Sequence, residues 1–177
     1  MSDENAISTR ITVKDYVGFD FSNQELREMD FTLSDMQKSD FSGADLLDAV
    51  LFSTNLRKTN FRGARLKRAD LRKADLNQAN LQKSLLRLAR LDGALLIDAK
   101  IEGANLKDAN LEGADLRGTR LLGANLSGAN LSVSDLRGAV YNEKTIWPDD
   151  FDPLEHGAIP VEWEPSDLEF EEDKSSD

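Results

Sequence analysis

Carboxylates are the most abundant reactive groups in this 177-residue sequence, and a pair of them can act as general acid and base. Aspartates recur at regular intervals, for example at Asp20 and Asp40, or at Asp35, Asp75 and Asp115. This regularity argues against a special catalytic pair, because every repeat of the chain offers the same outward position. We therefore interpret the aspartates as a solvated surface.

Other catalytic or metal-binding groups are scarce. The chain has no cysteine, which excludes a thiolate nucleophile, a disulfide and a cysteine-ligated metal, and its one histidine is His156 in PLEHGAIP. A phosphate-binding loop, a nucleophile elbow and a zincin motif are also missing. The sequence thus predicts no catalytic residue, no cofactor site and no metal site, so we do not expect an enzyme.

The elements that position these side chains follow a period of five residues. The stretch from Gly103 to Leu131 reads GANLKDANLEGADLRGTRLLGANLSGANL. Every fifth position from 21 to 141 gives 25 central residues, of which eighteen are Leu and four are Phe. Two residues before them stand Ala, Ser or Thr, except at the first three repeats. An α-helix repeats at 3.6 residues and a strand at 2.0, so neither explains this pattern.

A large and a small inward residue in every five indicate a chain that bends at each repeat around a narrow interior. Asn, Asp and Gly, which are frequent between them, adopt turn conformations at low cost. The sequence therefore predicts a coil with one turn per pentapeptide, stacked on itself. Fold alone does not specify a function.

These repeats resemble the pentapeptide-repeat family, as in Ala44-Asp45-Leu46, Ala79-Asn80-Leu81 and Ala104-Asn105-Leu106. The resemblance implies an all-β, right-handed quadrilateral β-helix with four pentapeptides per coil. Twenty-five repeats would then make about six coils and, at ~4.8 Å per coil, a rod of about 30 Å. Residues twenty apart would form ladders, and Phe21, Phe41 and Phe61 would stack in the core rather than bind a cofactor.

Four segments are expected along the chain: an N-terminal cap (1–18), the β-helix (19–141), a C-terminal cap (142–153) and an acidic tail (154–177). The closing segment YNEKTIWPDDFDP resembles the YNxxTxWPxxFDP ending of pentapeptide-repeat proteins from cyanobacteria and chloroplasts. The tail is expected to be partly disordered or docked on the rod. The end segments could either cap a monomer or pair two rods end to end.

The net charge of −11 is unevenly distributed. Residues 57–90 hold eleven basic and two acidic residues, a local charge of +9, whereas residues 142–177 hold two basic and thirteen acidic residues. Such a basic belt raises the local potential and attracts anionic partners. Apolar residues occupy outward positions near the belt. The predicted partner surface combines both kinds of residue: Arg65, Lys67, Arg68, Arg87, Leu85, Leu88, Leu95 and Ile97.

The leading functional interpretation is a non-catalytic protein–protein interaction, scaffold or regulatory module without a small-molecule substrate. The alternative is a DNA mimic that binds DNA gyrase or topoisomerase, although the belt has the wrong sign for imitating phosphates. A third class, direct binding of anionic lipid or nucleic acid by the belt, would show steep salt dependence. We expect no membrane partner, and the lack of aromatic residues interleaved in the belt outside the core argues against nucleic acid. No apolar run is long enough to span a membrane, and MSDENAIS lacks the features of a signal peptide, so we expect a cytoplasmic protein.

Overall fold

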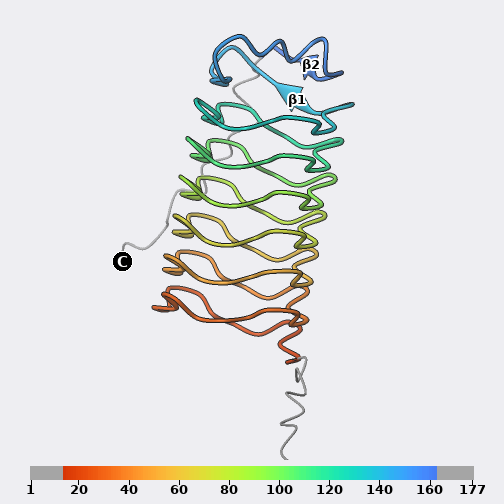
Figure 1. Cartoon of the computed structure of the whole chain (residues 1–177). Helices are drawn as coiled ribbons and strands as arrows, with labels where there is room; N and C mark the ends of the chain where they lie inside the picture. Colours follow the sequence, from red (N-terminus) through yellow and green to blue (C-terminus); the bar gives the residue numbers. More distant parts are fainter. Residues whose placement is uncertain (1–13, 163–177) are drawn as a thin grey trace, which may run out of the picture.

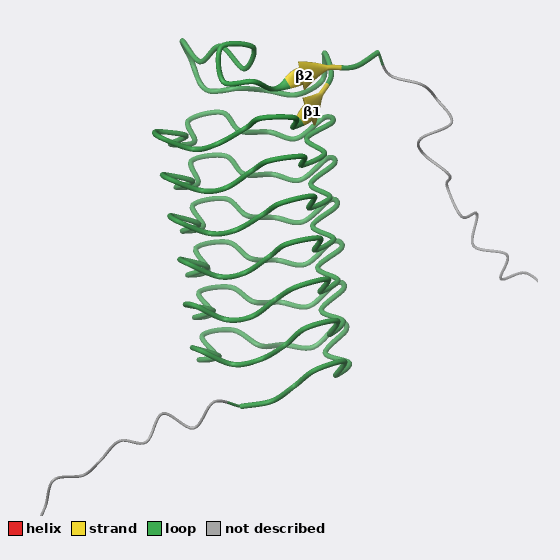
Figure 2. Ribbon diagram, turned by 90° about the vertical axis from the view of Figure 1, so that its right-hand side faces the viewer, coloured by secondary structure: helices red, strands yellow, loops and turns green. Residues whose placement is uncertain are grey.

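The computed structural model describes residues 14–162, which form a rod of stacked coils (Figures 1 and 2). Parallel β-bridges join residues twenty apart, from Asp15↔Asp35 to Arg120↔Val140. Four pentapeptides therefore close one coil and give the rod four walls. We number these walls as faces by their central residues: the first face from Phe21, the second from Leu26, the third from Phe31 and the fourth from Met36.

Backbone hydrogen bonds link each coil to the next on every face. The central Phe41 donates its N–H to the carbonyl of Asn60 in the following coil (2.7 Å). The residue before it, Asp40, donates to the carbonyl of Phe19 in the preceding coil (2.9 Å). We call the residue before each central residue the bridge position. Most bridges involve single residues, so the only strands in the described chain are β1 (Val140–Tyr141) and β2 (Ile159–Pro160).

The interior is filled by the two inward positions of each repeat. Central leucines and the small residues two places earlier are almost completely buried, for example Leu66 and Ala64 at 0% exposure. Phenylalanines of the first face stack in successive coils, with centroid distances of 4.7 Å for Phe21–Phe41 and 5.1 Å for Phe41–Phe61. These aromatic rings are therefore part of the packed core.

Each corner of the rod is a tight turn closed by a backbone hydrogen bond, such as Ala44 N–H to Phe41 O at 3.0 Å. The third residue of these turns has a positive φ, whether it is Gly43 (+66°) or Lys73 (+56°). A positive φ at this place alone defines a type II turn, for which glycine is the least strained residue. The glycines after many central residues are thus explained by backbone geometry.

The register shifts by one residue near the C-terminal end. Asn125 pairs with Ile146, twenty-one residues later, instead of residue 145. The shift is held by side chains, since Asn142 Oδ1 accepts the N–H of Gly123 (3.0 Å) and Thr145 Oγ1 donates to the carbonyl of Leu121 (2.8 Å). As a result Trp147, not Ile146, packs against the core above the second face.

Aromatic residues pack against the core at both ends of the described rod, and they include Tyr16 at one end and Trp147 and Phe151 at the other. Tyr16 and Gly18 already follow the repeat geometry, so the coils begin within the segment 1–18 that was expected to be a cap. At the other end β2 pairs in parallel with β1. The expected tail therefore begins as part of the rod, while residues 1–13 and 163–177 lie outside the described residues.

Candidate interaction surface

Aspartate or asparagine at the bridge position satisfies a backbone donor on the outside of the wall. The residue after most central residues has an N–H that no other coil accepts, and an Asp or Asn side chain at the bridge position accepts it instead. Examples are Ser42 N–H to Asp40 Oδ1 (2.8 Å) and Lys107 N–H to Asn105 Oδ1 (3.1 Å). The preference for Asp and Asn is therefore structural, a role that the sequence reading as a solvated surface had missed.

Two consecutive coils of the second face break this rule. Their bridge positions hold Arg65 and Leu85, which cannot accept a hydrogen bond in this way. The N–H groups of Lys67 and Arg87 consequently have no acceptor within residues 14–162. This part of the wall presents two outward donors to solvent, one above the other.

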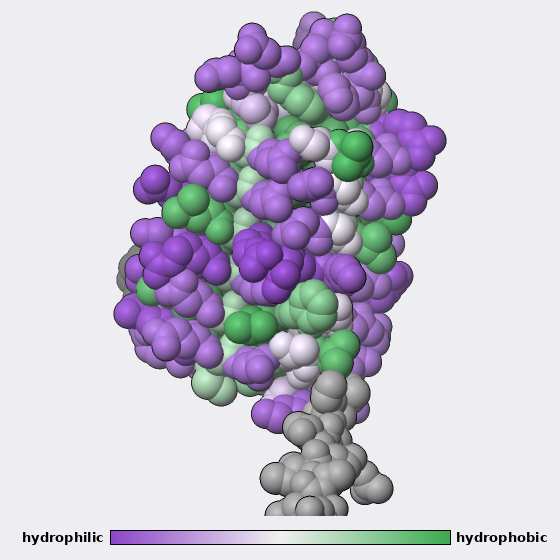
Figure 3. Space-filling view, viewed as in Figure 1, coloured by the Kyte–Doolittle hydropathy of each residue, from purple (hydrophilic) through white to green (hydrophobic). Residues whose placement is uncertain are grey.

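A hollow of about 180 Å³ lies at the same place. We call it the second-face groove; its lining residues are Leu47, Arg65, Lys67, Leu85, Arg87 and Asn105. Its volume is below the ~300–1,000 Å³ of typical small-molecule sites. The groove is thus suited to one or two side chains of a partner rather than to a cofactor. Figure 3 shows one side of the rod, on which apolar side chains interrupt a mainly polar surface.

Carboxylates from neighbouring coils offset part of the positive charge. Arg65 Nη1 lies 3.3 Å from Asp45 Oδ2, and Arg87 Nε lies 3.5 Å from Asp108 Oδ2. Both guanidinium groups are about half exposed. Lys67 forms no salt bridge with any residue in the described range. The hydrogen bond from the Arg68 side chain, with the charges of Arg68 and Lys67, lowers the pKa of Asp48. The local charge is therefore smaller than the +9 counted along residues 57–90 suggests.

Asp45 is the most buried of these carboxylates. Burial works to raise its pKa, but hydrogen bonds from the Leu47 N–H and from Arg27, with the charges of Arg27 and Arg65, lower it below the usual value. Arg27 Nη2 lies only 2.6 Å from Asp45 Oδ2. Because Asp45 is shared between Arg27 and Arg65, it neutralises only part of the positive charge of the Arg65 guanidinium.

The structure divides the predicted partner surface between two opposite faces. Arg65, Lys67, Leu85 and Arg87 come together in the second-face groove. Arg68 and Leu88 lie at its corner, where Arg68 forms a salt bridge with Asp48 (2.5 Å). Leu95 and Ile97 lie on the fourth face and so on the other side of the rod.

The apolar pair on the fourth face differs from the groove in its donors. Asn77, which is buried, accepts the N–H of Ile97 at 2.8 Å, so this backbone group is not available to a partner. On the third face, the Arg72 guanidinium lies over the Phe52 ring at 5.2 Å. At both apolar sites, neighbouring residues of the rod therefore already occupy a group that a partner could contact, namely the Ile97 N–H and the Phe52 ring.

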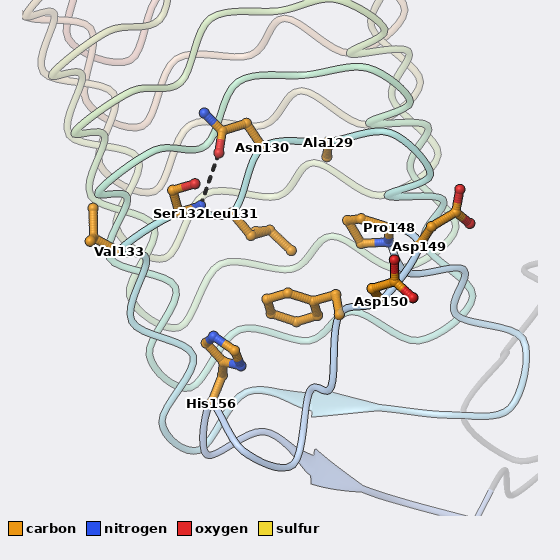
Figure 4. A pocket seen from close by; sticks show the side chains of 10 residues that line it. Ala129, Asn130, Leu131, Ser132, Val133, Pro148, Asp149, Asp150 and His156 are labelled. Atoms are coloured by element: carbon orange, nitrogen blue, oxygen red, sulfur yellow. Dashed lines mark hydrogen bonds between the residues drawn. The ribbon is translucent and has the colours of Figure 1, made fainter.

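A second hollow of about 320 Å³ lies between the end of the third face and residues 148–156 (Figure 4). Asp149, Asp150 and the exposed Val133 are among its lining residues. His156 stacks on Phe151 at 4.4 Å, and its Nδ1 lies 2.8 Å from the carbonyl oxygen of Asp152. The only histidine thus packs on an aromatic ring at the end of the rod.

The described residues contain no cluster of His, Cys, Asp and Glu side chains arranged to hold a metal ion. They also contain no helix that is long and apolar enough to cross a membrane.

Several solved structures are similar to this chain. A pentapeptide repeat protein from Nostoc PCC 7120 (alr5209) is 34% identical, with 60% of this chain and 84% of that chain covered and a TM-score of 0.44. The pentapeptide repeat protein Rfr23 from Cyanothece 51142 is 27% identical, with 75% and 90% covered and a TM-score of 0.45. QnrB1, a plasmid-mediated fluoroquinolone resistance protein, is 19% identical, with 84% and 90% covered and a TM-score of 0.37.

No curated protein matches the chain by sequence. The sequence profile of pentapeptide repeats matches it in eight copies over four overlapping stretches, 20–51, 45–82, 74–113 and 104–140. These stretches cover more than half of the chain and coincide with the regular coils. The chain therefore belongs to the pentapeptide-repeat family, and its rod is a right-handed β-helix.

Proposed function

We propose that this protein is a non-catalytic interaction module that binds an extended, acidic segment of another protein in the second-face groove. The observation that carries the proposal is the coincidence of three features at one place. Cationic side chains, apolar side chains and outward backbone donors all meet between the coils of Leu66 and Leu86.

Each feature selects a different part of such a segment. Leu47 and the exposed Leu85 (45%) offer apolar contact, which favours burial of a partner side chain. Lys67 and Arg87 attract carboxylates and steer association over distances up to about a Debye length, ~8 Å at physiological salt. The two free N–H groups can donate to carbonyl or carboxylate oxygens of the segment.

The rest of the molecule serves as a rigid support for this groove. We envisage about six coils, with the groove away from both ends. Binding at the groove is accordingly compatible with either a monomer or an end-to-end dimer.

A capture experiment from the native cell tests the proposal. The baits are the wild type, Lys67→Glu/Arg87→Glu, and the control Lys58→Glu/Lys73→Glu, in which exposed corner lysines away from the second face undergo the same charge change. We expect at least one protein to be retained by the wild type and the control and lost by the groove variant. Retention of the same proteins by all three baits would refute the proposal.

A supercoiling assay with DNA gyrase separates this function from DNA mimicry. The groove is basic and the described acidic residues next to it are paired with arginines, so we expect no inhibition at low micromolar concentration. Inhibition that survives in Lys67→Glu/Arg87→Glu would replace the proposed function by mimicry.

A further inference from the structure

The described chain ends next to the second face. β2 lies one coil beyond β1 on the first face, with Tyr141 opposite Pro160, and Val161 donates its N–H to the Tyr141 carbonyl (2.8 Å). The first face is followed by the second in chain order, so Glu162 lies at the corner between them. The described chain therefore ends beside the wall that carries the groove.

The length of that segment matches the distance to the groove. Along the rod, the coils of Leu86 and Leu66 lie four and five coils below the coil of β2, about 19 and 24 Å away at ~4.8 Å per coil. An extended chain advances about 3.3 Å per residue. Leu168, six residues beyond Glu162, and Phe170, eight residues beyond it, would therefore reach these two levels.

The chemistry of the segment is complementary to the groove. Residues 163–177 contain seven acidic residues and one lysine. Leu168 and Phe170 are two residues apart and would project to the same side of an extended chain, toward Leu47 and Leu85. By the same alternation, their acidic neighbours Asp167, Glu169 and Glu171 would point away from the wall, so they would be attracted by the cationic side chains of the groove without entering it.

We propose that residues 163–173 fold back along the second face and occupy the groove, with Leu168 and Phe170 on its apolar residues. The regulatory consequence, that the tail competes with the external partner, rests on the proposed function. The docking itself does not rest on the proposed function. It is argued from the place where the described chain ends and from the length and charge of the segment that follows.

The absence of native cysteine allows a direct test in the full-length chain. We compare the rate of intramolecular disulfide formation in the groove pair, Leu85→Cys/Leu168→Cys, with that in the control pair, Leu95→Cys/Leu168→Cys. Leu85 and Leu95 are similarly exposed (45% and 40%) bridge residues of one coil on opposite faces, so neither substitution disturbs the core. A disulfide requires Cα atoms about 4.4–6.8 Å apart, which only a docked tail would supply often.

We expect the groove pair to close at least about tenfold faster than the control pair, because docking raises the effective concentration of the thiols. In 1 M NaCl, where the Debye length falls to about 3 Å, the advantage should shrink. Adding Lys67→Glu/Arg87→Glu should also reduce it. Equal rates for the two pairs in low salt would overturn the inference.

The two proposals fail in different ways. If the groove pair shows no advantage while Lys67→Glu/Arg87→Glu still loses the captured protein, only the docked tail is refuted. If the groove pair closes faster but the Lys67→Glu/Arg87→Glu bait retains every captured protein, the tail docks and the proposed function is wrong.

Discussion

At the scale of single residues, the bridge position determines how much of the backbone is available on the outside of the rod. An Asp or Asn there accepts the neighbouring N–H and completes the wall, as Asn105 does for Lys107 (3.1 Å). Leu85 cannot do so, and leaves the Arg87 N–H open within the described chain. The groove thus coincides with one of several departures from the repeat, since Lys100 and Arg120 on the first face also lack an acceptor side chain.

Replacing Leu85 by Asn should restore the repeat and close the groove. We expect Leu85→Asn to increase the free energy of unfolding by about 0.5–1.5 kcal/mol, the usual net value of one hydrogen bond, while weakening partner binding. The control is Leu95→Asn, where the Ile97 N–H already has Asn77 Oδ1 at 2.8 Å and no such gain is expected. Urea unfolding measures the free energy of unfolding of both variants. Equal changes would show that the open Arg87 N–H is not the cause of any stabilisation by Leu85→Asn.

Asp135 makes a testable contribution to acid stability. The hydrogen bonds from the Arg137 side chain, then from its backbone N–H, lower the pKa of Asp135 from 3.8 to about 2. Because the pKa is lower in the folded state, its stabilisation is fully present above about pH 4 and is lost as the pH falls toward 2.

Asp135→Asn, which keeps an oxygen acceptor, should therefore be less stable than the wild type near pH 6. The difference should vanish near pH 2. Urea midpoints across this range provide the measurement, and a constant difference at every pH would contradict the assignment.

At the scale of the pentapeptide, interior volume is the controlling quantity. The position two residues before each central residue faces the opposite wall, and Ala74 there is completely buried. Serine fits the same position, as Ser84 shows by donating from Oγ to the Leu81 carbonyl (2.7 Å). The wall therefore tolerates a small polar group that finds its own turn carbonyl, but not a larger side chain.

Ala74→Leu should consequently destabilise the rod by about 1–3 kcal/mol or more, as overpacking does in other close-packed cores. Ala74→Ser should cost much less. Thermal unfolding of the two variants compares them directly. Similar melting temperatures would mean that the interior is less tightly packed than the coil geometry implies.

The period of five made the repeat geometry predictable, because one large and one small inward residue recur without interruption from Ala44 to Leu131. The shift near the end was not predictable in this way. Continuing the period would place Ile146 in the core, yet Asn142 and Thr145 bind the preceding coil and bring Trp147 inward instead. Side-chain hydrogen bonds between coils, which have no periodic signature, decided the register.

The candidate site was only partly predictable for a related reason. Sequence spacing placed Arg65, Lys67 and Arg87 on one face, and the structure brings them together. It did not reveal which cations pair with carboxylates of adjacent coils, since this depends on side-chain conformation. The open N–H groups became visible only when the role of the bridge aspartates and asparagines was known.

At the scale of the whole molecule, the rod has two opposite faces with comparable apolar content and different chemistry. The second face adds cations and open donors to Leu85, whereas the N–H beside Leu95 on the fourth face is already bonded. A rigid rod with one such wall offers a partner a defined orientation. The acidic charge of residues 142–177 has the sign that this wall would attract.

Photo-crosslinking in the native cell tests this difference between faces most directly. The photoreactive residue p-benzoylphenylalanine is placed at position 85 or at position 95, which are similarly exposed on opposite sides of one coil. We predict a discrete adduct with another protein from position 85, lost on adding Lys67→Glu/Arg87→Glu, and no equivalent adduct from position 95. Adducts of equal yield from both positions, or from position 95 alone, would contradict the account.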